Sequence, residues 1–215
     1  MERRTQFAGM VSVCNRPRAG RQARPMTQDV QHPKTQLCMR RPTLEDLPEI
    51  ELPPGYTIRT SQDGDGLHWA RIIRESFAND RFDVSRFERE MKCHPAYRPD
   101  RIFLVCASNR LPCGTASAYR QEYFGPNTGY LHYVGVCPAH AGKGLGAAVS
   151  LAALRKFQSE GLKSAVLQTD DFRLPAIKTY LRLGFSPMIM DENHPARWDV
   201  VFAGLGLSVP CEYGS

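Results

Sequence analysis

The stretch from Val134 to Ala147 has the residue types and spacing of a binding site for a negatively charged ligand. It reads VGVCPAHAGKGLGA, which predicts the end of a strand, a loop with glycines at 142, 144 and 146, and the start of a helix. Glycines let the backbone approach a ligand closely because no Cβ stands in the way. The first N–H groups of a helix lack partners within it, and the helix dipole favours negative charge there. The stretch therefore predicts a pyrophosphate site.

Two other phosphate-binding motifs are excluded by their spacing. A P-loop has four residues between its glycines, followed by Lys and Ser/Thr. Here six residues separate Gly135 from Gly142, and Gly144 stands where Ser/Thr is required. A dinucleotide-binding fingerprint needs the spacing G-x-G-x-x-G, and the last interval, from Gly144 to Gly146, is too short. On the residues alone, a glycine-rich turn without a ligand is the remaining alternative.

A second stretch carries a related signal. Residues 175–185 read PAIKTYLRLGF, a predicted helix with Pro175 at its first position and Gly184 at its C-terminal cap. The two stretches, in this order, resemble the two signatures of the GCN5-related N-acetyltransferase (GNAT) superfamily, and the resemblance covers roughly residues 42–205. Two positions depart from the pattern. Ala141 stands where the family usually has Arg or Gln, and Arg173 where it often has Asn.

The order of predicted elements agrees with this resemblance. Hydrophobic periodicity and turn signals predict strands at 56–59, 102–107, 113–120, 130–136, 165–168, 188–190 and 199–203, and helices at 67–77, 84–91, 145–157 and 175–183. The resemblance implies an α/β fold of the GNAT type. Its centre is a mixed, mostly antiparallel sheet with helices on both faces and a splay between the two central parallel strands.

The resemblance also implies acetyl-CoA as co-substrate, with no metal. The residues expected to hold it are Val134, Gly135, Val136, Gly142, Lys143, Gly144, Leu145, Gly146 and Ala147. We expect Lys143 to supply positive charge that Ala141 cannot. The backbone N–H of Val136 is expected to polarise the thioester carbonyl.

Two side chains are predicted to move protons in the transfer of an acetyl group to an amine. Tyr180 occupies the family's Tyr position, and a phenol of pKa ~10 is a suitable donor to a thiolate of pKa about 8–9. Packing on an apolar helix face is its alternative role. His132 is the predicted base, because residues 130, 132, 134 and 136 of a regular strand share one face. A half-buried strand histidine, with a water chain carrying the proton, is the other interpretation.

The residues expected to contact the acceptor are Tyr130, Asp170, Asp171 and Trp198. The two aspartates follow a predicted strand near the splay, where a carboxylate suits a cationic amine. Asp171 is equally suited to cap the following helix.

Charge is distributed unevenly along the chain. Residues 1–41 hold nine Lys/Arg against two Asp/Glu, whereas residues 42–215 hold nineteen against twenty. The basic segment has interspersed prolines and no sustained apolar periodicity, so we expect residues 1–41 to be a disordered tail and 42–215 to be the acetyltransferase domain. Because the predicted domain itself is not basic, no nucleic-acid partner is expected. No stretch is apolar enough to span a membrane.

These features favour a cytoplasmic N-acetyltransferase acting on a primary amine of a small molecule. Its seven cysteines include no C-x-x-C pair, which fits reduced thiols. A non-catalytic acyl-CoA-binding module and an acetyltransferase of protein or peptide amines remain as alternatives. The identity of the acceptor, and whether the protein is a monomer or a homodimer, stay open.

Overall fold

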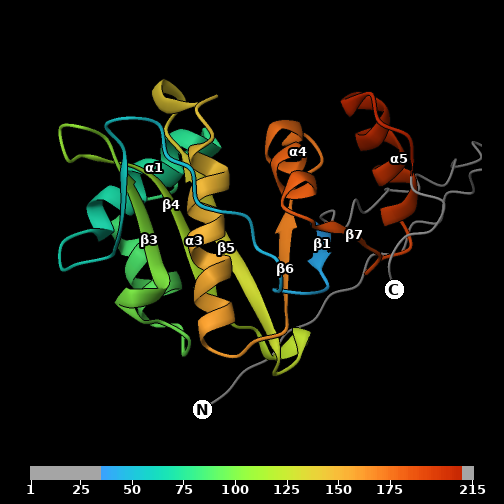
Figure 1. Cartoon of the computed structure of the whole chain (residues 1–215), viewed down its shortest axis with the longest axis horizontal. Helices are drawn as coiled ribbons and strands as arrows, with labels where there is room; N and C mark the ends of the chain where they lie inside the picture. The colour runs from blue at the N-terminus through green and yellow to red at the C-terminus, as the bar shows by residue number, and fades with distance from the viewer. Residues whose placement is uncertain (1–34, 210–215) are drawn as a thin grey trace, which may run out of the picture. The chain divides into compact units, whose positions relative to one another are not determined.

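The computed structural model describes residues 35–209, which form a mixed seven-stranded sheet flanked by helices (Figure 1). The strands lie in the order β2-β3-β4-β5-β6-β1-β7. Their bounds are β1 Leu37–Arg41, β2 Thr57–Thr60, β3 Ile102–Cys106, β4 Pro112–Tyr119, β5 Thr128–Val136, β6 Ser164–Thr169 and β7 Ser186–Met188. The longer helices are α1 Gly66–Phe77, α3 Leu145–Ser159, α4 Leu174–Arg182 and α5 His194–Leu205. The short helical segments are α2 Val84–Arg86, η1 Phe87–Lys92, η2 Pro99–Arg101, η3 Glu122–Phe124 and η4 Pro138–His140.

The central strands β5 and β6 run parallel, and the other neighbouring strands of this sheet are antiparallel. The parallel pair is short. It extends from Thr128 opposite Ser164 to Tyr130 opposite Val166, although β5 continues to Val136. Beyond Tyr130 the two strands separate, which leaves backbone polar groups of both strands without a strand partner. The predicted mixed sheet with a splay between its central parallel strands is confirmed.

Helices cover both faces of the sheet, as predicted. Helix α1 packs against β4 and β5 on one face and buries Trp69 and Ile73, while α3 packs against the same strands on the other face (Figure 1). The buried residues of α3 include Val149, Leu154 and Phe157, which join the larger hydrophobic cluster. Helix α4 contributes Ile177 to the same cluster as α3. Because burial of large apolar side chains is the main favourable term in folding, these helices fix the position of β5 from both sides.

Strand β1 corrects the predicted boundary of the N-terminal tail. Residues 37–41 were expected to be disordered, yet they form a strand between β6 and β7 in which Leu37, Cys38 and Met39 are fully buried. A run of three apolar residues beside Arg40 and Arg41 is too short to give a periodic signal. Its partners lie far along the chain, so only the tertiary structure reveals the strand. Residues 1–34, the rest of the predicted tail, lie outside the described residues.

Helix α5 corrects a second prediction. Residues 199–203 were predicted to form a closing strand, but they belong to a helix that begins at His194 and ends at Leu205. The buried positions Trp198, Val201 and Phe202 have the spacing of a helix face. Pro195 lies in the first turn, and Gly206 ends the helix with a φ of 65°. Residues 199–203 therefore follow the 3.6-residue period of a helix and not the two-residue period of a strand.

Gly129 in β5 is expected to tolerate no side chain. A Cβ at this position would overlap the ring of Phe157 on α3, which is itself fully buried. We therefore expect Gly129→Ala to destabilise the fold by about 1–3 kcal/mol, because overpacking forces shifts in a dense core. Thermal unfolding would show this as a lower Tm. An unchanged Tm would contradict the close packing of β5 against α3.

No helix between residues 35 and 209 is long and apolar enough to cross a membrane. Over the same residues, no group of three or more His, Cys, Asp and Glu side chains is arranged to hold a metal ion.

Candidate active site

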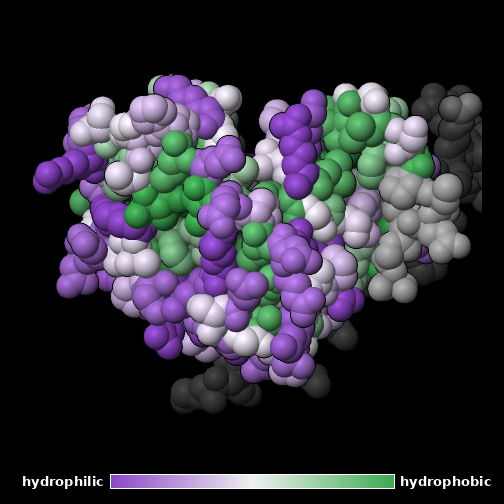
Figure 2. Space-filling model, in the orientation of Figure 1, coloured by the Kyte–Doolittle hydropathy of each residue, from purple (hydrophilic) through white to green (hydrophobic). Residues whose placement is uncertain are grey.

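A groove lies where α4 faces the start of α3 across the end of β5, and we call it the α3–α4 groove. It encloses about 610 Å³. The surface is indented at this place, at its upper edge between α4 and the part that carries α1 and α3 (Figure 2). The predicted cofactor residues that line it are Val134, Gly135, Val136, Gly142, Gly144, Leu145, Gly146 and Ala147. The structure therefore brings together eight of the nine residues predicted to hold acetyl-CoA.

The loop before α3 is built to accept an anion. Gly142 and Gly144 both have a φ of 75°, a conformation that glycine adopts without strain. No atom lies within 4 Å of a Cβ built at either position, so the surface beside them is open. Gly144 is the N-cap of α3 and supplies no side chain to cap the helix. The first N–H groups of α3 are thus left for a ligand, which is the requirement for holding a diphosphate.

Lys143 is the exception among the predicted cofactor residues. It does not line the α3–α4 groove, and its Nζ donates instead to the hydroxyl of Tyr56 at 2.9 Å. The hydroxyl of Tyr56 also contacts Nδ1 of His140 at 2.9 Å, and His140 does line the groove. Because residues 142 and 144 take left-handed conformations, the side chain between them is directed to Tyr56 rather than to the groove.

Strand β5 contains a bulge that changes which residues share a face. Gly135 pairs with Thr115 and His132 with Ser117, so β5 has one residue more than β4 between these pairs. Tyr133 takes up the extra residue with a φ of 46°, in the left-handed region. His132 and Tyr133 both face α1. The centroid of the Tyr133 ring lies 5.0 Å from that of Trp69 on α1, and the centroid of the His132 ring lies 4.0 Å from that of Tyr133. The prediction that residues 130 to 136 alternate regularly is therefore wrong.

Because of the bulge, Val134 and Val136 lie on the face of β5 away from His132. Val134 and Val136 pack against the hydrophobic cluster that includes α3, whereas a Cβ at Gly135 would meet Ile73 of α1 at 3.1 Å. Bulges bend strands and re-aim side chains beside functional sites. In this chain the bulge lies at the splay, so that consecutive residues of β5 reach two cavities.

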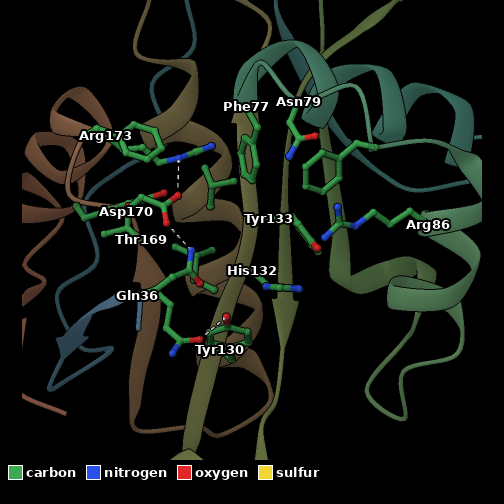
Figure 3. A pocket seen from close by; sticks show the side chains of 16 residues that line it. Gln36, Phe77, Asn79, Arg86, Tyr130, His132, Tyr133, Thr169, Asp170 and Arg173 are labelled. Atoms are coloured by element: carbon green, nitrogen blue, oxygen red, sulfur yellow. Dashed lines mark hydrogen bonds and ion pairs between the residues drawn. The ribbon is translucent and has the colours of Figure 1, made fainter. Parts of the chain in front are cut away.

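The second cavity, which we call the β5 pocket, encloses about 360 Å³ on the other side of the splay (Figure 3). In Figure 3, Arg173 and Asp170 stand on one side of the pocket and Asn79 and Arg86 on the opposite side, and Phe77 lies between the two sides, next to Arg173. Strand β5 contributes Tyr130, Leu131, His132, Tyr133 and Val134. The cavity adjoins the α3–α4 groove, because both are lined by Phe77, Val134, Phe172, Arg173 and Tyr180.

Tyr180 lies at the junction of the two cavities. It extends from α4, is 7% exposed and lines both the α3–α4 groove and the β5 pocket. Burial raises the pKa of Tyr180 to about 12, and the positive charge of Arg173 offsets part of this effect. The phenol therefore holds its proton throughout the neutral range and is available to donate it.

His132 lines the β5 pocket among aromatic rings. Its ring lies 4.9 Å from that of Tyr130 and 5.7 Å from that of Tyr119. Burial, followed by the charge of His94, lowers the pKa of His132 to about 3. The imidazole is therefore neutral at pH 7 and a weaker base than an exposed histidine. A pKa this low favours the alternative interpretation, a buried strand histidine with water carrying the proton, and the role of His132 as the base stays a prediction.

The pKa of His132 leads to a prediction about pH dependence. A pKa lowered to about 3 means that this imidazole carries no proton between pH 5 and 8, so activity should show no inflection from it near pH 6.5. We expect His132→Gln not to change the pH at which kcat/KM falls on the acid side of its profile. The measurement is a pH profile of kcat/KM for both proteins. A limb near pH 6.5 that disappears in the variant would show that His132 titrates as the base.

Two of the four residues predicted to contact the acceptor line the β5 pocket, and two do not. Tyr130 and Asp170 line the β5 pocket, where the Tyr130 hydroxyl donates to Gln168 at 3.1 Å. Asp171 does not line it and forms an ion pair with Arg197 at 2.5 Å. Trp198 is wholly buried within the hydrophobic cluster and reaches neither cavity. Its assignment was wrong because it depended on the mistaken closing strand.

Arg173 is the main site residue that sequence reasoning did not assign. Its guanidinium stacks on Phe77 at 3.5 Å from the ring centroid, and its Nε lies 3.2 Å from Oδ2 of Asp170. It lines both cavities. The available signal was its position immediately before α4, where the resemblance expects an asparagine. A longer, charged side chain at this position reaches across the splay.

A second unassigned group lies behind the opposite wall of the β5 pocket. The carboxylate of Glu90, on the π-helical segment η1, accepts from the Tyr133 hydroxyl and pairs with Arg86 at 2.7 Å. Burial acts to raise the pKa of Glu90, but hydrogen bonds from Tyr133 and Arg86, together with the charges of Arg86 and Arg89, hold it below its usual value. This group holds Tyr133 in its left-handed conformation. Irregular helical turns are frequent at functional sites.

Comparison with models of known protein families shows to which family the chain belongs. The model described as the acetyltransferase (GNAT) family matches residues 68–185, more than half of the chain. The chain belongs to this family. The match covers most of α1, the splayed strands, the α3–α4 groove and Tyr180, so the resemblance inferred from the two signatures is confirmed.

Curated relatives in the family share about a third of their residues with this chain. The mycothiol acetyltransferase of Thermomonospora curvata is 31% identical over 161 residues, and that of Thermobispora bispora is 32% identical over 160 residues. These matches cover 72% and 71% of this chain but 52% and 54% of the relatives. The chain thus spans about half the length of the curated relatives it matches.

Solved structures agree on the fold. A GCN5-related N-acetyltransferase from Sphaerobacter thermophilus has a TM-score of 0.59 at 20% identity, covering 72% of this chain and 50% of that one. The ribosomal-protein-S18-alanine N-acetyltransferase from Escherichia coli has a TM-score of 0.52 at 18% identity, covering 62% of this chain and 79% of that one. At such identities the likeness concerns the fold.

Proposed function

We propose that this chain transfers the acetyl group of acetyl-CoA to a primary amine of a small molecule. The observation that carries the proposal is the junction of two cavities at Val134 and Tyr180. One cavity has a glycine loop and a free helix start suited to a diphosphate, and the other is a polar pocket. A donor in the first and an acceptor in the second would meet at the splay. Held in this way, the two reactants gain from proximity and orientation.

In the proposed reaction, the backbone N–H of Val136 polarises the carbonyl of the thioester. The N–H of Cys137 donates to Cys113 of β4 at 2.8 Å. Neighbouring N–H groups of an extended strand point to opposite edges, so that of Val136 is directed away from β4 and toward the splay. A donor at this position stabilises negative charge as it develops on the carbonyl oxygen.

The proton balance assigns roles to Tyr180 and His132. As the amine forms its bond to the carbonyl carbon, the C–S bond breaks and the departing thiolate takes the phenolic proton of Tyr180. The amine loses one proton to water, with neutral His132 accepting a hydrogen bond from the incoming N–H. The product amide and the CoA thiol then leave, and solvent restores the proton of Tyr180.

Support for a small acceptor comes from the pocket and from the relatives. The β5 pocket is bounded by β5, by the end of β6 with the turn that leads to α4, and by the segment after α1. Its walls carry amide, hydroxyl and charged groups in addition to aromatic rings. The curated relatives are named mycothiol acetyltransferases, which act on a small molecule.

Turnover with a panel of amines tests the proposal. The purified chain is first titrated with acetyl-CoA while its thermal unfolding is followed, since a ligand of the folded state raises the Tm. It is then incubated with acetyl-CoA and each amine, and release of free thiol is measured together with the mass of the acetylated product. Acetylation of at least one small amine is expected. Binding without transfer to any amine would favour a non-catalytic acyl-CoA-binding module, and transfer only to peptides would favour a protein acceptor.

A further inference from the structure

Three side chains beside the loop before α3 form a continuous chain of hydrogen bonds. Lys143 Nζ lies 2.9 Å from the hydroxyl of Tyr56, and this hydroxyl lies 2.9 Å from Nδ1 of His140. The ring of Tyr56 meets that of His140 edge-on at 5.8 Å, and Lys143 lies 5.4 Å from the centre of the Tyr56 ring. Two residues of the glycine loop are thereby tied to one residue of a distant segment.

The direction of these hydrogen bonds follows from which of the three side chains can donate and which can accept a proton. The ammonium of Lys143 can only donate, so the Tyr56 hydroxyl accepts from it. The same hydroxyl then donates its own proton to Nδ1 of His140. This arrangement leaves the Nε2–H of His140 as a donor, and His140 lines the α3–α4 groove. The chain of bonds therefore fixes the orientation of a donor beside the proposed diphosphate site.

Tyr56 is itself well anchored. Its N–H donates to the carbonyl of Pro53 at 3.2 Å, closing a turn in which Gly55 has a φ of 83°. Strand β2 begins at the next residue, and the Tyr56 side chain packs against the larger hydrophobic cluster. The loop, by contrast, contains two glycines, which allow many conformations in the absence of a constraint. A fixed partner reduces the entropy lost when the loop orders around a ligand.

We infer that Tyr56 is a positioning residue for the phosphate groups of CoA, acting through His140 and Lys143. The inference rests on the proposed use of acetyl-CoA. Ala141, within the loop, supplies no polar side chain, so the loop takes its constraint from outside. Tyr56 does not itself line the α3–α4 groove, so it acts only through its two partners in the loop before α3. Its influence is confined to the phosphate end.

Removal of the Tyr56 hydroxyl tests this inference by binding alone. Calorimetry would compare CoA with pantetheine, which lacks the phosphates, on the wild type, Tyr56→Phe and the control Tyr97→Phe. Tyr97 is a partly buried tyrosine that packs on Phe87 and lines neither cavity. We expect Tyr56→Phe to weaken CoA binding about tenfold, because His140 would no longer be held in position and its hydrogen bond to a charged phosphate would be lost. Pantetheine affinity and Tm should not change, and Tyr97→Phe should resemble the wild type.

A second pair of variants distinguishes positioning from general packing. If Tyr56 and Lys143 act in one chain of bonds, Tyr56→Phe combined with Lys143→Met should bind CoA no more weakly than the worse single variant. The inference would be overturned if the double variant lost the sum of the two single losses in CoA binding free energy. It would also be overturned if Tyr56→Phe weakened the binding of CoA and pantetheine equally, or if it left the affinity for CoA unchanged. Failure of the wild type to bind CoA would overturn the proposed function together with it, and is thereby distinguished from the other outcomes.

Discussion

Replacing Tyr180 with phenylalanine is expected to lower kcat by about 10²–10⁴-fold, the range for loss of a general acid. The affinity for acetyl-CoA should stay close to that of the wild type, because the aromatic ring keeps its contacts in the α3–α4 groove and the phenol acts on the departing thiolate. Burial raises the pKa of Tyr180 to about 12, so its proton is present over the whole neutral range. Steady-state kinetics and calorimetry with acetyl-CoA separate the two effects.

Tyr130→Phe is the matched control for this substitution. Tyr130 is also a buried tyrosine, but it lines the β5 pocket alone, and its hydroxyl donates to Gln168. Its loss should raise KM for the amine more than it lowers kcat. An unchanged kcat in Tyr180→Phe would remove Tyr180 from the mechanism and leave it a packing role against Phe185, whose ring lies 6.1 Å away.

The second large effect is expected at Gly144. An alanine at this position would have to keep a φ of 75°, at a cost of roughly 1–2 kcal/mol, or rotate away from it. Rotation away from this φ turns the N–H groups at the start of α3 away from the diphosphate, so binding would require the strained conformation to be restored. Since a hydrogen bond to a charged group contributes about 1.5–3 kcal/mol, we expect Gly144→Ala to weaken acetyl-CoA binding at least about tenfold.

Gly161 provides a control at the other end of α3. It has a φ of 78°, and no atom lies within 4 Å of a Cβ built on it, so its local environment matches that of Gly144. It lies in the turn before β6 and lines neither cavity. Gly161→Ala should lower the Tm as much as Gly144→Ala but leave acetyl-CoA affinity intact. Equal affinities in the two variants would contradict a diphosphate at the start of α3.

The sequence was most informative where a local pattern has one physical meaning. The glycine spacing after a strand and the proline and glycine at the ends of α4 are local signals. They correctly predicted the loop and both helices. Eight of the nine residues predicted to hold the cofactor line one groove, and their role remains a prediction. The position of Tyr180 at the junction of the two cavities agrees with its predicted role as the acid, which remains a prediction.

The features that the sequence did not reveal depend on contacts between distant segments. Strand β1 is stabilised by β6 and β7, and within its own segment it is only a short apolar run. The bulge at Tyr133 is held by Glu90, more than forty residues earlier, so alternation along β5 alone could not predict it. Arg173 and Lys143 have roles set by their partners Phe77 and Tyr56 rather than by their positions in a motif.

A crystal structure of the complex with CoA would show most directly whether the thioester is held at the junction of the two cavities. We expect the diphosphate to contact the backbone N–H groups of residues 142–146 and the sulfur to lie between Val134 and Tyr180, at the junction of the α3–α4 groove and the β5 pocket. A sulfur atom on the far side of the groove from Tyr180, or CoA bound away from the start of α3, would contradict this expectation.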